Sequence, residues 1–145
     1  RAACREVLGQ DAETVTPMRC AGDHFAYRVR CAGQELLFRA AADATGDDYM
    51  LAEDAAMAAA RAVGVPVPHV LRTVAEPCAG LRWQLMELVP GSTLRDLAID
   101  RAAIAADLGR ILRRLHTVGA EGYGFLDTAH LRSGAGMRGL DASYG

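Results

Sequence analysis

The segment at residues 65–68 reads Val-Pro-Val-Pro and follows directly on Gly64. Proline has no backbone N–H and disfavours helix in the residue before it, so no helix runs through this segment. The preceding alanine-rich stretch predicts a helix to about Val63, with Asp47 and Asp48 as capping carboxylates and Gly64 as a left-handed stop. The chain must therefore end a helix here and continue extended.

Strands are predicted on both sides of this helix. Alternating apolar residues predict a half-buried strand at residues 25–31, and a tight turn at Ala32 and Gly33 connects it to a second strand at 35–39. The apolar side of the first strand carries Phe25, Tyr27, Val29 and Cys31. Further strands are predicted at residues 15–18, 70–74 and 81–89, with a loop at 76–80. We expect an α+β fold, in which a helix covers an antiparallel sheet.

Helices are predicted after residue 90. Thr93 and Asp96 have capping-box spacing for a short helix, and Asp100 would cap a longer one from about Arg101 to Val118. The longer helix carries an apolar stripe that we expect to be buried, made of Ile104, Leu108, Ile111, Leu112, Leu115 and Val118. Residues 119–145 predict loop with one helical turn near 128–131, and the first ten residues are compatible with a short helix closed by Gly9.

Length and charge exclude several classes of protein. A chain of 145 residues with 51% hydrophobic content suffices for one globular domain or part of a larger protein. Its 16 basic and 18 acidic residues give a net charge of −2, which disfavours nucleic-acid and membrane partners. All the basic residues are arginine, which excludes lysine chemistry. Without a leader or a long apolar run, we expect a soluble, cytoplasmic protein, cut at both ends.

The four cysteines, at positions 4, 20, 31 and 78, form no Cys-x-x-Cys pair. A chain of this size does not need disulfides to fold. We expect reduced structural thiols, with a zinc site as the weaker alternative.

One carboxylate interrupts the apolar side of the predicted alanine-rich helix. Glu53 lies between Met50 and Met57 at helical spacing, so we expect it to face the interior and to need a cation. Arg39, at the end of the second hairpin strand, is the best placed partner. The alternative is that both residues are solvated ends of their elements.

The turn before the strand at 25–31 contains Gly22, Asp23 and His24. Its backbone amides are compatible with a phosphate nest, although glycine is common in turns for steric reasons alone. Each of the other histidines, His69, His116 and His130, is better explained by packing or surface exposure than by metal binding. Motifs of the Gly-x-Ser-x-Gly, Walker and Gly-x-Gly-x-x-Gly types are absent.

Taken in order, these pieces resemble the amino-terminal lobe of the aminoglycoside phosphotransferase family, small-molecule kinases with a protein-kinase-like fold. The most specific part runs from Glu53 through Arg61-Ala-Val-Gly-Val-Pro-Val-Pro68 to Trp83-Gln-Leu-Met-Glu-Leu-Val-Pro-Gly-Ser-Thr-Leu94. The segment at residues 108–116 looks like the first helix of the family's large lobe, and Gly122-Tyr-Gly-Phe-Leu-Asp127 is similar to a segment that often follows it.

The resemblance implies roles for particular residues. Glu53 would orient Arg39 against the phosphates of a nucleotide, where the family commonly has lysine. The turn of Gly22, Asp23 and His24 would cover the nucleotide. The adenine would meet three further residues: the side chain of Met86, the carbonyl of Glu87 and the amide of Val89. Residues 1–89 would form the nucleotide-binding small lobe, and residues 90–145 the start of the helical large lobe.

The resemblance also implies parts that this sequence lacks. Phosphoryl transfer in the family uses a His-x-Asp loop and a later metal-binding Asp, and no histidine here has Asp two positions later. We therefore expect a fragment of an ATP-dependent or GTP-dependent phosphotransferase for a small-molecule hydroxyl, inactive alone, with its Mg²⁺ ligands outside this chain. A non-catalytic nucleotide-binding or interaction module, or an unrelated α+β domain, is the alternative.

Overall fold

The computed structural model describes residues 1–19, 24–41, 49–78, 81–92 and 101–143. It forms two compact units: Arg1–Asp54 with Pro68–Leu88, and Ala55–Val67 with Val89–Gly145. The assignment of residues 1–89 and 90–145 to a small and a large lobe stays a prediction. The predicted caps Asp47, Asp48 and Asp100 and the short helix from Thr93 to Asp96 lie outside the described residues.

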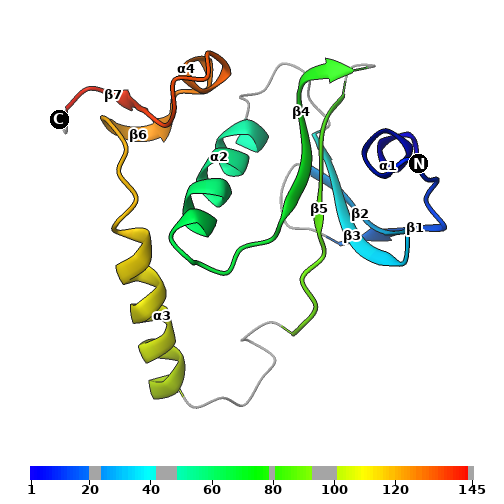
Figure 1. The fold of residues 1–145 in the computed structure, drawn as a ribbon, viewed down its shortest axis with the longest axis horizontal. Coiled ribbons are helices and arrows are strands. Elements are labelled where there is room, and N and C mark those ends of the chain that lie inside the picture. The colour runs from blue at the N-terminus through cyan, green and yellow to red at the C-terminus, as the bar shows by residue number, and fades with distance from the viewer. Residues whose placement is uncertain (20–23, 42–48, 79–80, 93–100, 144–145) are drawn as a thin grey trace. The chain divides into compact units, whose positions relative to one another are not determined.

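The first unit is built on a five-stranded antiparallel sheet in the order β1-β2-β3-β5-β4 (Figure 1). Its strands are β1 (Thr14–Met18), β2 (His24–Cys31), β3 (Gln34–Ala41), β4 (Val70–Cys78) and β5 (Leu81–Glu87). The sheet and its helices confirm the predicted α+β fold, and β1 to β3 form the predicted meander. Ala32 and Gly33 both have positive φ, 52° and 72°, as the two-residue turn between β2 and β3 requires.

Strand β4 is longer than predicted. It continues through Glu76 and Pro77 to Cys78, which pairs with Leu81 after an irregularity in the ladder, so the predicted loop at 76–80 is wrong for these residues. β4 is an edge strand of the sheet, where proline costs no ladder hydrogen bond if its nitrogen faces outward. Strand β5 ends at Glu87, two residues earlier than predicted.

One face of the sheet packs against helix α1 (Ala2–Leu8), which Gly9 ends with a φ of 69°. The core on this face contains Cys4, Val29, Cys31, Leu36, Trp83 and Leu85. The rings of Phe38 and Trp83 stack there with centroids 5.7 Å apart. The predicted burial of Phe25 is wrong, because Phe25 is 54% exposed, while the neighbouring Ala26 is buried. Phe25 lies on the same side of β2 as the buried Val29 and Cys31 but near the start of the strand, so position along the strand, and not alternation alone, decides burial.

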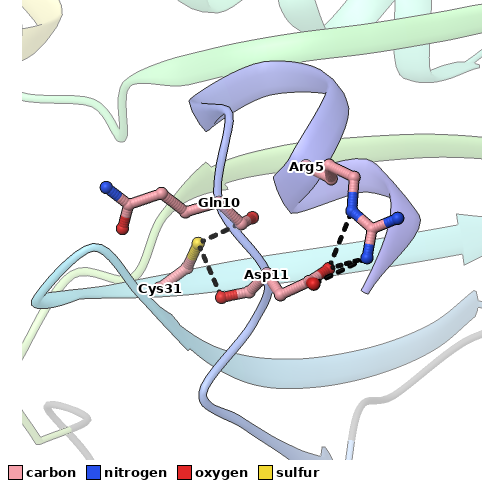
Figure 2. Close-up of polar contacts among 4 residues, drawn as sticks. All are labelled: Arg5, Gln10, Asp11 and Cys31. Carbon is pink, nitrogen blue, oxygen red and sulfur yellow. Dashed lines mark hydrogen bonds and ion pairs between the residues drawn. The ribbon is translucent and has the colours of Figure 1, made fainter.

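Polar contacts hold the segment that follows α1 against the sheet (Figure 2). The Cys31 thiol donates to the carbonyls of Gln10 and Asp11, at 3.6 and 3.7 Å. The Arg5 guanidinium binds both carboxylate oxygens of Asp11, and this hydrogen bonding lowers the pKa of the Asp11 carboxyl. Cys4 and Cys31 are buried free thiols, and burial raises the pKa of Cys4 to about 11.

Helix α2 (Tyr49–Ala62) begins on the other face of the sheet, where the buried Met50 accepts a hydrogen bond at its carbonyl from Gln84 Nε2, at 3.4 Å. The helix ends before Gly64, whose φ of 75° confirms the predicted left-handed stop. Within the second unit, Arg114 Nη1 donates to the Gly64 carbonyl at 2.6 Å.

Helix α3 (Arg101–Leu115) confirms the predicted long helix but not the full burial of its stripe. Leu108 and Leu112 are 48% and 51% exposed, and the stripe's other members are only half-buried. Periodicity identifies the apolar side of a helix, but burial needs a neighbour to cover it. Within the described part of the chain, no helix is long and apolar enough to cross a membrane.

The C-terminal stretch holds more structure than predicted. Helix α4 (Thr128–Arg132) confirms the single helical turn, but strands β6 (Tyr123–Leu126) and β7 (Gly139–Asp141) form a small antiparallel sheet that we did not predict. Three glycines of this stretch, Gly122, Gly124 and Gly139, serve close packing: a Cβ on Gly139, for example, would lie 2.2 Å from the Tyr123 carbonyl oxygen. These three glycines therefore indicate close contact between segments and not simply loop.

Candidate functional site

An ion pair joins the sheet to helix α2. The Arg39 guanidinium, on β3, binds the Glu53 carboxylate through Nη2. The Arg39 side chain is 22% exposed and that of Glu53 44% exposed. The predicted pairing is therefore present, and the alternative of a fully solvated end is wrong for Arg39.

The expectation that Glu53 faces the interior is wrong in part. Three residues along a helix turn the side chain by about 300°, which sets Glu53 roughly 60° round the helix from Met50. Met50 is buried, whereas the Glu53 carboxylate lies half-exposed at the flank of the helix. A half-exposed carboxylate is accessible to solvent and can still hold the arginine.

Gln84 completes the cluster and was not among the predicted site residues. Gln84 lies in the middle of β5 and is 0% exposed. Its Oε1 accepts from Arg39 Nη2 at 2.6 Å, and its Nε2 donates to Thr73 Oγ1 at 3.1 Å. The signal available in the sequence was a lone amide within an apolar strand, two residues before Met86 and thus on the same face as it.

One polar atom of the cluster has no hydrogen-bond partner among the residues that the structure describes. Arg39 Nε is buried and makes no hydrogen bond within the part of the chain that the structure describes. The two hydrogen bonds that the Arg39 side chain makes with described residues both use Nη2. The guanidinium is therefore held at one end by two oxygen acceptors, one of them charged.

The predicted adenine-contacting residues lie at and just beyond the end of β5. Met86 is buried and pairs with Leu37 of β3 and Val70 of β4. The Glu87 amide donates to the His69 carbonyl at 2.8 Å, and the Glu87 carboxylate accepts from the His69 amide at 3.1 Å. Val89 is exposed.

The predicted nucleotide-covering turn is described only at its last residue. Gly22 and Asp23 lie outside the described residues, and His24 is half-buried at the start of β2, opposite Ala41. A pocket of about 390 Å³ lies beside this end of the β1–β2 hairpin. Its lining includes Met18, Arg19, His24, Phe25 and Ala26.

Catalytic and metal-binding groups are not evident in the described ranges. In those ranges, no three His, Cys, Asp or Glu side chains are placed to hold a metal ion. The cluster of Arg39, Glu53 and Gln84 presents a positioned cation. It can bind an anion, but it contains no base or nucleophile aimed at a reacting atom.

A model of a known protein family matches the part of the chain that contains this cluster. The model of the phosphotransferase enzyme family, APH, matches residues 21–136, which is most of the chain. The chain belongs to this family. A comparison with curated protein sequences found no significant match.

Several solved structures share the fold of this chain. Aminoglycoside phosphotransferase APH(4)-Ia matches with a TM-score of 0.70 at 12% identity, over 99% of this chain and 45% of that one. A thermostable mutant of that enzyme, in a ternary complex with ADP and hygromycin B, gives a TM-score of 0.66 at 12% identity over the same shares of the two chains. A putative fructosamine-3-kinase from Thermobifida fusca YX-ER1 matches with a TM-score of 0.57 at 26% identity, over 86% of this chain and 41% of that one. This chain therefore spans less than half of each structure.

Proposed function

We propose that this member of the phosphotransferase family supplies the nucleotide-binding part of an ATP-dependent or GTP-dependent kinase for a hydroxyl of a small molecule. The observation that carries the proposal is the Arg39–Glu53 pair between β3 and α2. Kinases of this type use a basic side chain on the third strand, oriented by a helix carboxylate, to position the nucleotide phosphates.

The chemistry of Arg39 suits this role. Its two hydrogen bonds engage Nη2, so Nη1 is the nitrogen that we expect to donate to a phosphate oxygen. A guanidinium stays charged at any physiological pH and offers several donors in a fixed plane. An arginine can therefore replace the family's lysine at this position if its plane is held in place.

The adenine would lie beside the end of β5. The buried Met86 would contact the ring, the Glu87 carbonyl and the Val89 amide would bind its polar edge, and the turn of Gly22, Asp23 and His24 would cover the phosphates. The two hydrogen bonds between Glu87 and His69 support this proposal, because they fix the backbone of Glu87 and hence the direction of its carbonyl.

The described residues do not fit a magnesium site, because no three of their His, Cys, Asp or Glu side chains are placed to hold a metal ion. The chain also has no His-x-Asp motif to orient an acceptor hydroxyl. We therefore propose that this chain alone does not transfer phosphate. ATP-dependent phosphorylation of a small alcohol by this chain would contradict that proposal. The structure of a relative with ADP and hygromycin B supports a nucleotide and a small-molecule acceptor as the partners.

Nucleotide binding is tested by titrating the chain with a fluorescent ATP analogue, N-methylanthraniloyl-ATP, without and with competing ATP. Arg39→Ala should weaken binding by roughly tenfold or more, since it removes a charge-assisted hydrogen bond. Glu53→Gln should weaken binding less, because the amide oxygen still accepts from Arg39. Arg5→Ala is the matched control: it removes another guanidinium–carboxylate pair, beside α1. Equal affinity of wild type and Arg39→Ala would reject the proposed site.

Arginine in place of lysine favours a second candidate function, that of a nucleotide-binding module that does not catalyse phosphoryl transfer. The coding sequence after residue 145 discriminates the two. A His-Gly-Asp-like motif there supports the kinase, and a stop codon supports the module.

A further inference from the structure

The most deeply buried polar side chain of the described residues belongs to Gln84, on β5. An amide buried without hydrogen bonds is costly, so its polar atoms must find partners. They do: Oε1 accepts from Arg39, and Nε2 donates to the Thr73 hydroxyl and to the Met50 carbonyl. The amide therefore contacts β3, β4 and α2 at once.

These partners fix which way the amide points. The Arg39 guanidinium only donates and the Met50 carbonyl only accepts. A flipped amide would set its NH₂ group against the guanidinium and its oxygen against the carbonyl, and both contacts would be repulsive. Gln84 therefore presents its oxygen to Arg39 in this fold.

The contacts of Gln84 set the geometry of the ion pair from both sides. Arg39 and Gln84 are direct partners in the β3–β5 ladder, so the bond between their side chains runs straight across two neighbouring strands. The bond to the Met50 carbonyl fixes the turn of α2 that leads into Glu53. One side chain thus holds the guanidinium and also the helix that carries its carboxylate.

We propose that Gln84 is the positioning residue that allows arginine to serve at the phosphate-binding position of this chain. An arginine side chain has large rotational freedom, and the half-exposed Glu53 alone leaves its plane free to rotate about the bond between them. The second acceptor from Gln84 fixes that plane and directs Nη1 away from both acceptors. This inference rests on the proposed nucleotide site and deepens it.

The first test measures the guanidinium itself and needs no nucleotide. NMR signals of the Nη protons stay separate when rotation of the group is restricted and merge when it is free. Wild type should show separate signals for Arg39, assigned by their loss in Arg39→Lys, and Gln84→Met should merge them. Gln34→Met, which removes an exposed glutamine at the start of β3, should leave them separate. Separate Arg39 signals in Gln84→Met would overturn the proposal, whatever the nucleotide affinity.

The second test is a double-mutant cycle on affinity for N-methylanthraniloyl-ATP. Gln84→Met should weaken binding roughly tenfold in the arginine background, from the lost hydrogen bond to a charged group. It should change binding less than about twofold in the Arg39→Lys background, because an ammonium has no plane to orient. Equal losses of affinity on Gln84→Met in both backgrounds would show that Gln84 has only a structural role and would overturn the proposal.

The two tests distinguish failure of the proposed nucleotide site from failure of the proposed positioning role of Gln84. If Arg39→Ala binds the nucleotide as well as wild type, the proposed function fails, while the NMR result still decides whether Gln84 orients Arg39. Gln84→Leu provides a second apolar variant in case Gln84→Met does not fold. Circular dichroism and thermal unfolding check each variant.

Discussion

Arg39 and Gln84 face each other across the β3–β5 ladder, and their side chains meet 2.6 Å apart on the sheet face where α2 begins. The contact joins a charged donor to a neutral amide that is inaccessible to water. Such a hydrogen bond is strong when both partners are present. Loss of one partner leaves the other buried and unsatisfied, which destabilises the fold. Substitutions around Gln84 should therefore have larger effects than their small size suggests.

Thr73→Val should lower the free energy of unfolding by about 1–3 kcal/mol, because it leaves a buried N–H of Gln84 without its acceptor. Thr73→Ser keeps the hydroxyl and should cost clearly less. Urea unfolding of both variants measures the difference. Valine keeps the methyl group of threonine and lacks only the hydroxyl, so a loss for valine no larger than that for serine would contradict the prediction.

The buried Cys4 thiol should make the protein less stable at alkaline pH. Its pKa is raised from the ordinary 9.0 to about 11, chiefly by burial, so above pH 9 the unfolded chain loses this proton before the folded chain does. The contribution of the protonated Cys4 thiol to the free energy of unfolding is complete below pH 9 and is lost as pH rises towards about 11. Unfolding free energies measured from pH 8 to pH 11 should decline more steeply in wild type than in Cys4→Ala. Parallel curves would contradict this expectation.

Asp127 should stabilise the C-terminal segment only above acidic pH. It caps α4 by accepting from the His130 amide at 3.0 Å and binds Arg138 at 2.6 Å. The hydrogen bond from Arg138 lowers the pKa of this carboxyl below its ordinary 3.8. Its contribution is therefore present above pH 3.8 and lost as pH falls below that value.

Amide hydrogen exchange of His130 reports on this contact. Exchange should become faster in Asp127→Ala at neutral pH. Asp127→Asn keeps a capping oxygen but loses the charge and should show an intermediate rate. If alanine and asparagine exchange equally fast, the ion pair with Arg138, and not the cap, protects the amide.

Two glycine-to-alanine substitutions should have opposite effects. Gly139→Ala places a methyl group 2.2 Å from the Tyr123 carbonyl oxygen and should disrupt the pairing of β6 with β7. Gly109→Ala meets no neighbour within 4 Å in helix α3 and should stabilise the chain by about 0.5–1 kcal/mol. Thermal unfolding followed by circular dichroism measures both. A stabilising Gly139→Ala would contradict the close approach of the two strands.

Several elements of the fold followed from local signals in the sequence. Gly64 and the prolines after it ended α2 where predicted, and the turn at Ala32 and Gly33 set the hairpin, because backbone conformation depends on the residues at the turn itself. The pairing of Arg39 with Glu53 was also predicted from the sequence, although Glu53 lies at the flank of α2 and not on its buried side.

Contacts between distant segments decided the rest. The burial of Gln84, the exposure of Phe25 and Leu108, and the pairing of β6 with β7 depend on which segments meet, and no local pattern encodes that. A glycine is compatible equally with a loop and with close strand packing, and a lone amide in a strand is compatible with either face. Only tertiary structure brings Gln84, Arg39 and the first turn of α2 together, because burial and hydrogen-bond partners are properties of the packed chain.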